Sequence, residues 1–111
     1  MATSYKSLGQ LDLTTTALTT LYTCPSSTET VLSTVIIANR TATADSFRLA
    51  IRTDGDAISN KHYIAYDVPV AANDSTTLTL GITVKATDVI SVQATTADRL
   101  SINAFGAEVT V

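Results

Sequence analysis

The longest apolar and β-branched run in the chain covers residues 31–40, with the sequence VLSTVIIANR. Side chains along a strand point alternately to its two faces. Strict alternation puts Leu32, Thr34, Ile36 and Ala38 on one face and Val31, Ser33, Val35 and Ile37 on the other. Neither face is polar between residues 35 and 38, so we predict a central strand that its own domain or a neighbouring subunit covers on both sides.

Shorter segments with alternating or Thr-rich patterns predict the remaining strands. They cover residues 6–13, 17–24, 46–53, 62–68, 78–84, 88–95 and 100–111, with a bulge expected at Gly106 in the last. In the segment 46–53, Phe47, Leu49 and Ile51 are expected to face the core. In the segment 62–68, His62, Ile64, Tyr66 and Val68 are expected to share one face. Pro69 cannot donate to a ladder, so that strand should end there or lie at a sheet edge.

No window shows an apolar helical period with caps, and turn residues separate the strand segments at intervals of about ten residues. This spacing predicts an all-β protein, an antiparallel β-sandwich of seven to eight short strands with Ig-like or jelly-roll-like Greek key topology and almost no helix. Residues 1–111 should form a single domain. Residues 1–13 are either a strand or an N-terminal arm that orders against a partner.

Composition narrows the function classes. The formal net charge is -3 and no run of Lys or Arg occurs, which argues against a nucleic-acid partner. No apolar run approaches the length of a membrane helix, and the first residues lack the apolar region of a signal peptide, so we expect neither a membrane partner nor the secretory route. Only 15% of the residues are charged while 45% are apolar, a surface suited to being covered by a partner.

Candidate chemistry is sparse. Cys24 is the only cysteine and is expected to be a buried small hydrophobe. Asp54 and Asp56, with Ser59 and Asn60 nearby, offer oxygen ligands for calcium, but acidic residues beside a glycine are also typical of a turn. His62 is the only histidine, and no nucleophile elbow accompanies it. We therefore expect no enzyme activity, no metal and no cofactor.

Two arginines give an acidic protein a local basic surface. Arg48 and Arg52 alternate with apolar residues of the segment 46–53 and should point outward together. Such a stripe suits a partner surface that carries carboxylates. The alternative is that the arginines pair with Asp54, Asp56 and Asp67 on neighbouring segments and have no further role.

Six short segments carry a resemblance to a known class of proteins: 38–40 (ANR), 47–52 (FRLAIR), 60–67 (NKHYIAYD), 72–74 (AND), 80–83 (LGIT) and 87–90 (TDVI). In this order they resemble small β-sandwich virion structural proteins of tailed bacteriophages, cyanophages included. The similarity spans residues 31–105, and the first thirty residues match it least.

The resemblance implies a non-enzymatic virion protein that is assembled in the host cytoplasm. The function expected first is a capsid decoration or cement protein, a homo-oligomer with a trimer favoured, bound to the major capsid protein or another virion protein across capsomer joints. The alternatives are a tail, baseplate or fibre-associated protein and, in a different class, a carbohydrate-binding module. The contact is expected in residues 2–13 and 54–61, with the interface residues Arg48, Arg52, Lys61, Tyr63, Tyr66, Leu8 and Leu11.

Overall fold

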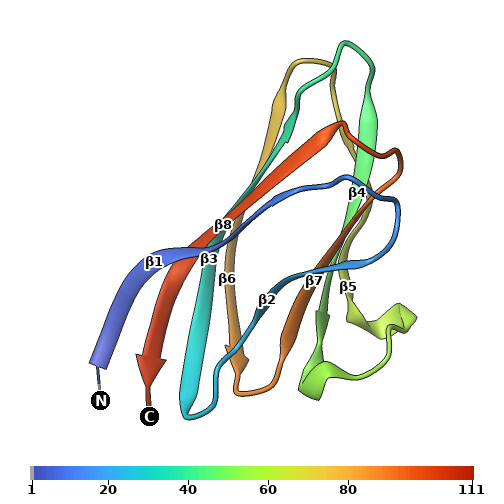
Figure 1. Ribbon diagram of the computed structural model, residues 1–111. Helices are drawn as coiled ribbons and strands as arrows, with labels where there is room; N and C mark the ends of the chain where they lie inside the picture. The colour runs from blue at the N-terminus through green and yellow to red at the C-terminus, as the bar shows by residue number, and fades with distance from the viewer. Residues whose placement is uncertain (1) are drawn as a thin grey trace.

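The computed structural model describes residues 2–111, which form eight strands in two four-stranded antiparallel sheets (Figure 1). The strands are β1 (Ala2–Asp12), β2 (Thr19–Thr23), β3 (Thr28–Asn39), β4 (Asp45–Arg52), β5 (Tyr63–Val70), β6 (Ser75–Lys85), β7 (Val89–Ala94) and β8 (Leu100–Thr110). The first sheet has the strand order β1-β8-β3-β6 and the second has the order β2-β7-β4-β5. The described residues contain no α-helix, only two short 3-10 turns at Thr53–Gly55 and Asn60–His62.

The pairing of the strands identifies the topology as a jelly roll. The first strand pairs with the eighth and the third with the sixth in the first sheet, while the second pairs with the seventh and the fourth with the fifth in the second sheet. The chain is thus wrapped as one long folded hairpin, which makes two Greek keys. The predicted all-β antiparallel sandwich is confirmed, and of the two topologies considered the jelly roll is the one observed.

The core lies between the two sheets. Its fully buried side chains include Leu32, Ile37 and Ile102 from the first sheet and Phe47, Leu49 and Ile90 from the second. These are large aliphatic and aromatic side chains, so each strand buries one face against the opposite sheet. Cys24 is 2% exposed and contacts the Thr28 carbonyl and the Thr30 hydroxyl, which confirms the expected buried thiol.

Strand β3 lies inside the first sheet, as predicted, but strict alternation of its side chains is wrong. The register against both neighbours shifts between Leu32 and Thr34. Against β8 the extra residue is Ser33, a β-bulge on β3, whereas against β6 the extra residue is on β6. Consequently Leu32, Val35 and Ile37 all face the core. Ile36 is left on the outer face, where it is only half-buried.

Strand β5 is the outer strand of the second sheet, in agreement with the position of Pro69. The predicted sharing of one face by its alternate residues is wrong, because two register shifts against β4 break the alternation. One shift lies near Asp67, whose φ of 54° is in the left-handed region. Ile64 and Tyr66 are exposed, whereas Val68 beyond the shift is half-buried against the core.

The bulge expected at Gly106 is not on β8 but on the two strands that flank it. The extra residues are Ser33 on β3 and Leu8 on β1, on the two strands that flank β8. A Cβ atom on Gly106 would lie 2.0 Å from the Val31 carbonyl oxygen. The glycine is therefore required by the close approach of β3 to β8.

The N-terminal segment is an edge strand of this chain. Strand β1 pairs with β8 from Ala2 opposite Thr110 to Asp12 opposite Ser101. The two termini consequently lie side by side at one end of the sandwich (Figure 1). Residues 2–7 are exposed, so the first half of this strand extends past the packed core. Residue 1 of the expected arm lies outside the described residues.

A polar network closes this end between the sheets. The Tyr22 hydroxyl donates a hydrogen bond to Glu108 Oε2 at 2.5 Å and lies 2.8 Å from Thr30 Oγ1. The Lys6 ammonium donates to Glu108 Oε1 at 2.9 Å. The four residues belong to β2, β8, β3 and β1, so the network fastens both sheets where apolar packing ends.

Candidate interaction surfaces

The outer face of the second sheet carries a compact cluster around Arg48. The Arg48 guanidinium donates to both carboxylate oxygens of Asp67, at 2.7 and 3.3 Å, and its Cζ atom lies 3.9 Å from the centroid of the Tyr66 ring. Tyr63 meets the edge of Tyr66 with ring centroids 5.0 Å apart. The ion pair raises the pKa of Arg48 and lowers the pKa of Asp67, since each charge stabilises the other.

Arg52 lies further along the same strand but is held by the loop that follows it. Its guanidinium donates to the Gly55 and Asp56 carbonyls and to Ser91 Oγ. Both arginines are on the outer face, as predicted, and both are already paired within the chain. Arg48 pairs with a carboxylate, whereas Arg52 satisfies backbone carbonyls.

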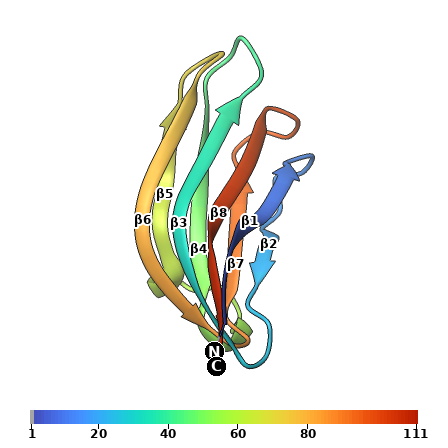
Figure 2. The same cartoon turned by 90° about the vertical axis from the view of Figure 1, so that its left-hand side faces the viewer.

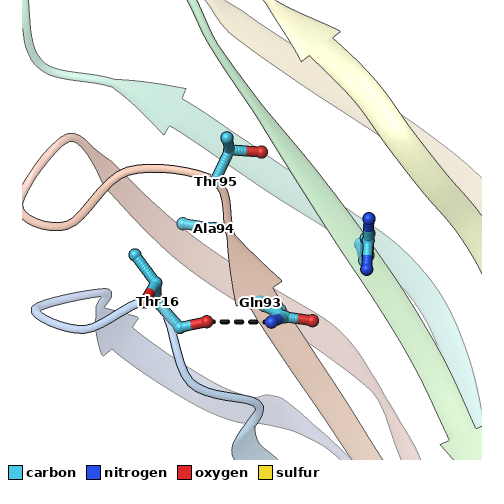
Figure 3. A pocket seen from close by; sticks show the side chains of 5 residues that line it. Thr16, Gln93, Ala94 and Thr95 are labelled. Carbon is cyan, nitrogen blue, oxygen red and sulfur yellow. Dashed lines mark hydrogen bonds between the residues drawn. The ribbon is translucent and has the colours of Figure 1, made fainter.

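A small hollow opens beside this cluster (Figure 3). Thr16, Arg48, Gln93, Ala94 and Thr95 line about 230 Å³ of space. The amide of Gln93 spans its floor and donates to the Thr16 carbonyl at 2.8 Å. The lining is half polar and its best donor is already used, so the hollow offers a partner little unpaired chemistry.

The outer face of the first sheet carries a larger and more apolar depression. We call it the apolar hollow, about 510 Å³ lined by Tyr5, Lys6, Val31, Ser33, Phe105, Gly106 and Ala107. Tyr5 is 86% exposed, Val31 39% and Phe105 38%. Large apolar side chains gathered on one exposed face are typical of a site that a partner covers.

Most of the outward positions around the apolar hollow are uncharged. In register across the sheet, Val31 lies opposite Ala107 and Thr83, while Thr34 lies opposite Phe105 and Thr79. The other outward positions of these strands include Ile36, Ala38, Ser101, Asn103, Ser75 and Thr77. None of these is charged, whereas Lys6 lines the hollow, and Glu29 and Lys85 face outward together at one end of the sheet. A partner that covers this area therefore has few charged groups to desolvate.

The structure brings together only part of the interface set predicted from the sequence. Arg48, Tyr63 and Tyr66 form one cluster, and Lys61 is exposed in the second 3-10 turn, directly before β5. Leu8 belongs to the buried core, and Leu11 packs against it half-buried. These two leucines therefore support β1 rather than present themselves at the surface.

Sequence reasoning missed the apolar hollow. Its three large side chains come from β1, β3 and β8, which adjoin only through the jelly-roll pairing of both chain ends. One signal was present: with Ile102 and Ala104 facing inward, alternation places Phe105 outward. For Val31 the same rule fails. Strict alternation places Val31 on the same face as Val35, but the bulge at Ser33 leaves Val31 on the outer face and Val35 in the core.

The residues singled out for chemistry have local partners. Asp54 accepts a hydrogen bond from the Thr87 hydroxyl and belongs to the turn after β4. His62 is 5% exposed, and its Nδ1 accepts from the Ser59 backbone N–H at 3.0 Å, which ties the loop to the start of β5. Within residues 2–111 no three His, Cys, Asp or Glu side chains converge as metal ligands would.

The sequence matches no known family model, and no curated protein matches it. Among solved structures, the fold is similar to a chain of the acidic stable capsid structure of Helicobacter pylori bacteriophage KHP30. The superposition has a TM-score of 0.57 at 12% sequence identity and covers 100% of this chain and 90% of that chain. The two chains share the fold over nearly their whole lengths. Within residues 2–111, no helix is both long and apolar enough to cross a membrane.

Proposed function

We propose that this chain is a structural protein of a bacteriophage virion, and specifically a capsid decoration or cement protein. The observation that carries the proposal is the whole-length fold similarity to a chain of a phage capsid structure. Because the superposition leaves only a tenth of that chain uncovered, the neighbour is also a small chain of similar length. We propose that this protein shares the role of that neighbour, a small all-β chain of a capsid.

The surface supports such a role. The outer face of the first sheet carries few charges around the apolar hollow, and apolar burial is the main favourable term in most protein association. A protein that binds the assembled lattice but not its separated subunits stabilises the shell by mass action. The partner is the major capsid protein or another virion protein, and the complex would assemble in the host cytoplasm.

The contact is assigned to the apolar hollow. Arg48 and Arg52 on the opposite sheet remain the alternative contact predicted from the sequence, but each would have to exchange a partner it already has. Val31 and Phe105 have no such competing interaction, so their burial by a partner is favourable without rearrangement.

Two other roles were considered from the sequence. A tail, baseplate or fibre protein would use the same surface at fewer copies per particle. A carbohydrate-binding module would need an open aromatic platform. Tyr63 and Tyr66 do meet, but at an interplanar angle of 86° and with Arg48 over the Tyr66 ring, which is no flat stacking surface.

The proposal is tested by adding purified protein to capsids from particles that lack it. Saturable co-sedimentation and a higher temperature of capsid disruption are expected. Val31→Lys places a charge in the apolar hollow and should lower the capsid affinity at least about tenfold, the equivalent of about 1.4 kcal/mol. The Arg48→Glu, Arg52→Glu double variant changes the opposite face and should bind normally.

The two variants separate the proposal from the position of the contact. Lost binding in the arginine variant alone would move the contact to the second sheet and keep the decoration role. If the unmodified protein neither binds the capsid nor delays its disruption, the decoration role is wrong.

A further inference from the structure

The two sheets have four edge strands, and three of them carry features that prevent pairing with another chain. β5 has Pro69 and two register shifts. β2 is five residues long and irregular. β1 carries Lys6, Asp12 and the bulge at Leu8. Charges, proline, bulges and shortness are the usual means by which exposed edges avoid association.

The fourth edge, β6, lacks most of this protection. It runs for eleven residues from Ser75 to Lys85 with the sequence STTLTLGITVK, which has no proline and no charge before Lys85. Within the described residues it pairs with β3 alone. Its one register shift places an extra residue on β6, where Leu80 and Gly81 lie opposite Ser33, but the alternation of buried and exposed positions along β6 is unbroken. A long edge that is rich in threonine and keeps its alternation is a template for a further strand.

The core is also incompletely covered along this edge. Leu78, Leu80 and Ile82 point inward from β6 and pack against the core, yet all three are only partly buried. Figure 2 shows β6 and β5 together along one side of the sandwich, and on β5 Ile64 is 45% exposed. A strand added to β6 would bury the exposed parts of these side chains.

Charge at the two ends of β6 selects a second copy of the chain as the added strand. Asp74 precedes the strand and Lys85 ends it; both are exposed, and within residues 2–111 neither forms an ion pair. In an antiparallel pair centred on Leu80, Lys85 lies opposite Ser75 of the second copy and beside its Asp74. The two-fold axis repeats this contact at the other end.

We infer that β6 pairs with β6 of a second copy about a two-fold axis at Leu80, joining the two four-stranded first sheets into one continuous sheet. The contact is isologous and closes at two copies. It does not depend on the virion role, because it concerns the purified chain alone, and it replaces the trimer expected from the resemblance with a dimer.

Crosslinking of single-cysteine variants tests the register. Residues directly opposite in an antiparallel pair have Cα atoms about 4.5–5.5 Å apart, within the range of a disulfide. Leu80→Cys should therefore form an intermolecular disulfide under mild oxidation. Thr77→Cys lies on the same edge but about 20 Å from its symmetry mate, six residues along the strand, and should not. The native Cys24 is buried, so an intermolecular disulfide is expected to form only through the introduced thiol.

Sedimentation equilibrium of the unmodified protein and two charge variants tests the contact without oxidation. Lys85→Glu places a carboxylate beside Asp74 of the second copy at both ends and should weaken the dimer about fivefold at low salt. Lys61→Glu makes the same charge change in the loop before β5 and should leave the dimer affinity unchanged.

Three results would overturn the inference: a monomer at every concentration measured, a trimer, or equal crosslinking of the two cysteine variants. If circular dichroism shows that Leu80→Cys does not fold, the sedimentation equilibrium of the unmodified protein and of Lys85→Glu still tests whether the dimer forms through β6. A dimer that leaves capsid binding absent would support the β6 contact and contradict only the virion role.

Discussion

Single residues decide how the two sheets are fastened at the end where the termini lie. The Tyr22 hydroxyl is shared between Glu108 and Thr30, and burial together with the Glu108 carboxylate raises the pKa of Tyr22, so the hydroxyl stays a donor. This arrangement satisfies polar groups from three strands with one side chain. The network stabilises the fold because it gives the Thr30 hydroxyl and the Glu108 carboxylate a hydrogen-bond partner.

Removing that hydroxyl should therefore cost stability. Tyr22→Phe leaves the Thr30 hydroxyl with only the weakly bonding Cys24 thiol and Glu108 with Lys6 alone, and we expect the free energy of unfolding to fall by about 2 kcal/mol. Urea unfolding measures this loss. Tyr5→Phe removes the same atom from a side chain that is 86% exposed and should change the free energy by less than about 0.5 kcal/mol. Equal losses in both variants would mean that the network does not stabilise the fold.

The same network predicts a dependence on pH. Hydrogen bonds from Tyr22 and then Lys6 favour the charged form of Glu108 and hold its pKa below the ordinary value of 4.5. Near that pH the unfolded chain binds more protons than the folded one, so the stabilisation from Glu108 is present above about pH 4.5 and is lost as the pH falls through the folded pKa. Glu108→Gln should thus differ most from the unmodified protein near neutral pH. Urea unfolding across a pH series should show the difference narrowing in acid, and a constant difference would contradict the assignment.

At the scale of the strands, the close approach of β3 to β8 shapes the first sheet. Gly106→Ala would drive a methyl group against the Val31 carbonyl, and we expect a loss of about 3 kcal/mol in the free energy of unfolding, the upper end for overpacking. Gly81→Ala is the matched control, since no atom lies within 4 Å of its Cβ position, and its effect should stay within about 0.5 kcal/mol. Thermal or urea unfolding of the pair compares them directly. Equal stability of the two variants would show that β3 can move away from Gly106 at no cost.

Strand existence was readable from the sequence because apolar alternation and turn residues mark each element locally. The bulge at Ser33 could not be predicted from the sequence, since both phases of residues 35–38 are apolar and either register buries a hydrophobic face. In β5, the exposed Ile64 and Tyr66 follow from register shifts against β4, which depend on tertiary pairing. Outward placement of Arg48 and Arg52 was predicted correctly, because between residues 46 and 52 only one phase is charged.

At the scale of the whole molecule, the sandwich presents three different outer surfaces. The second sheet shows a polar face whose arginines are internally paired. The first sheet shows a face with few charges and the apolar hollow, and the β6 edge offers unused backbone donors and acceptors. A chain with two uncovered surfaces can contact a second copy through the edge and a capsid through the hollow without competition between them.

The most direct test of the virion role is the copy number of this chain in purified particles, measured by quantitative mass spectrometry against the major capsid protein. A decoration protein is expected at copies comparable to the shell subunit. A handful of copies per particle would place the chain in the tail or baseplate instead. Absence from the particle would contradict the virion role itself.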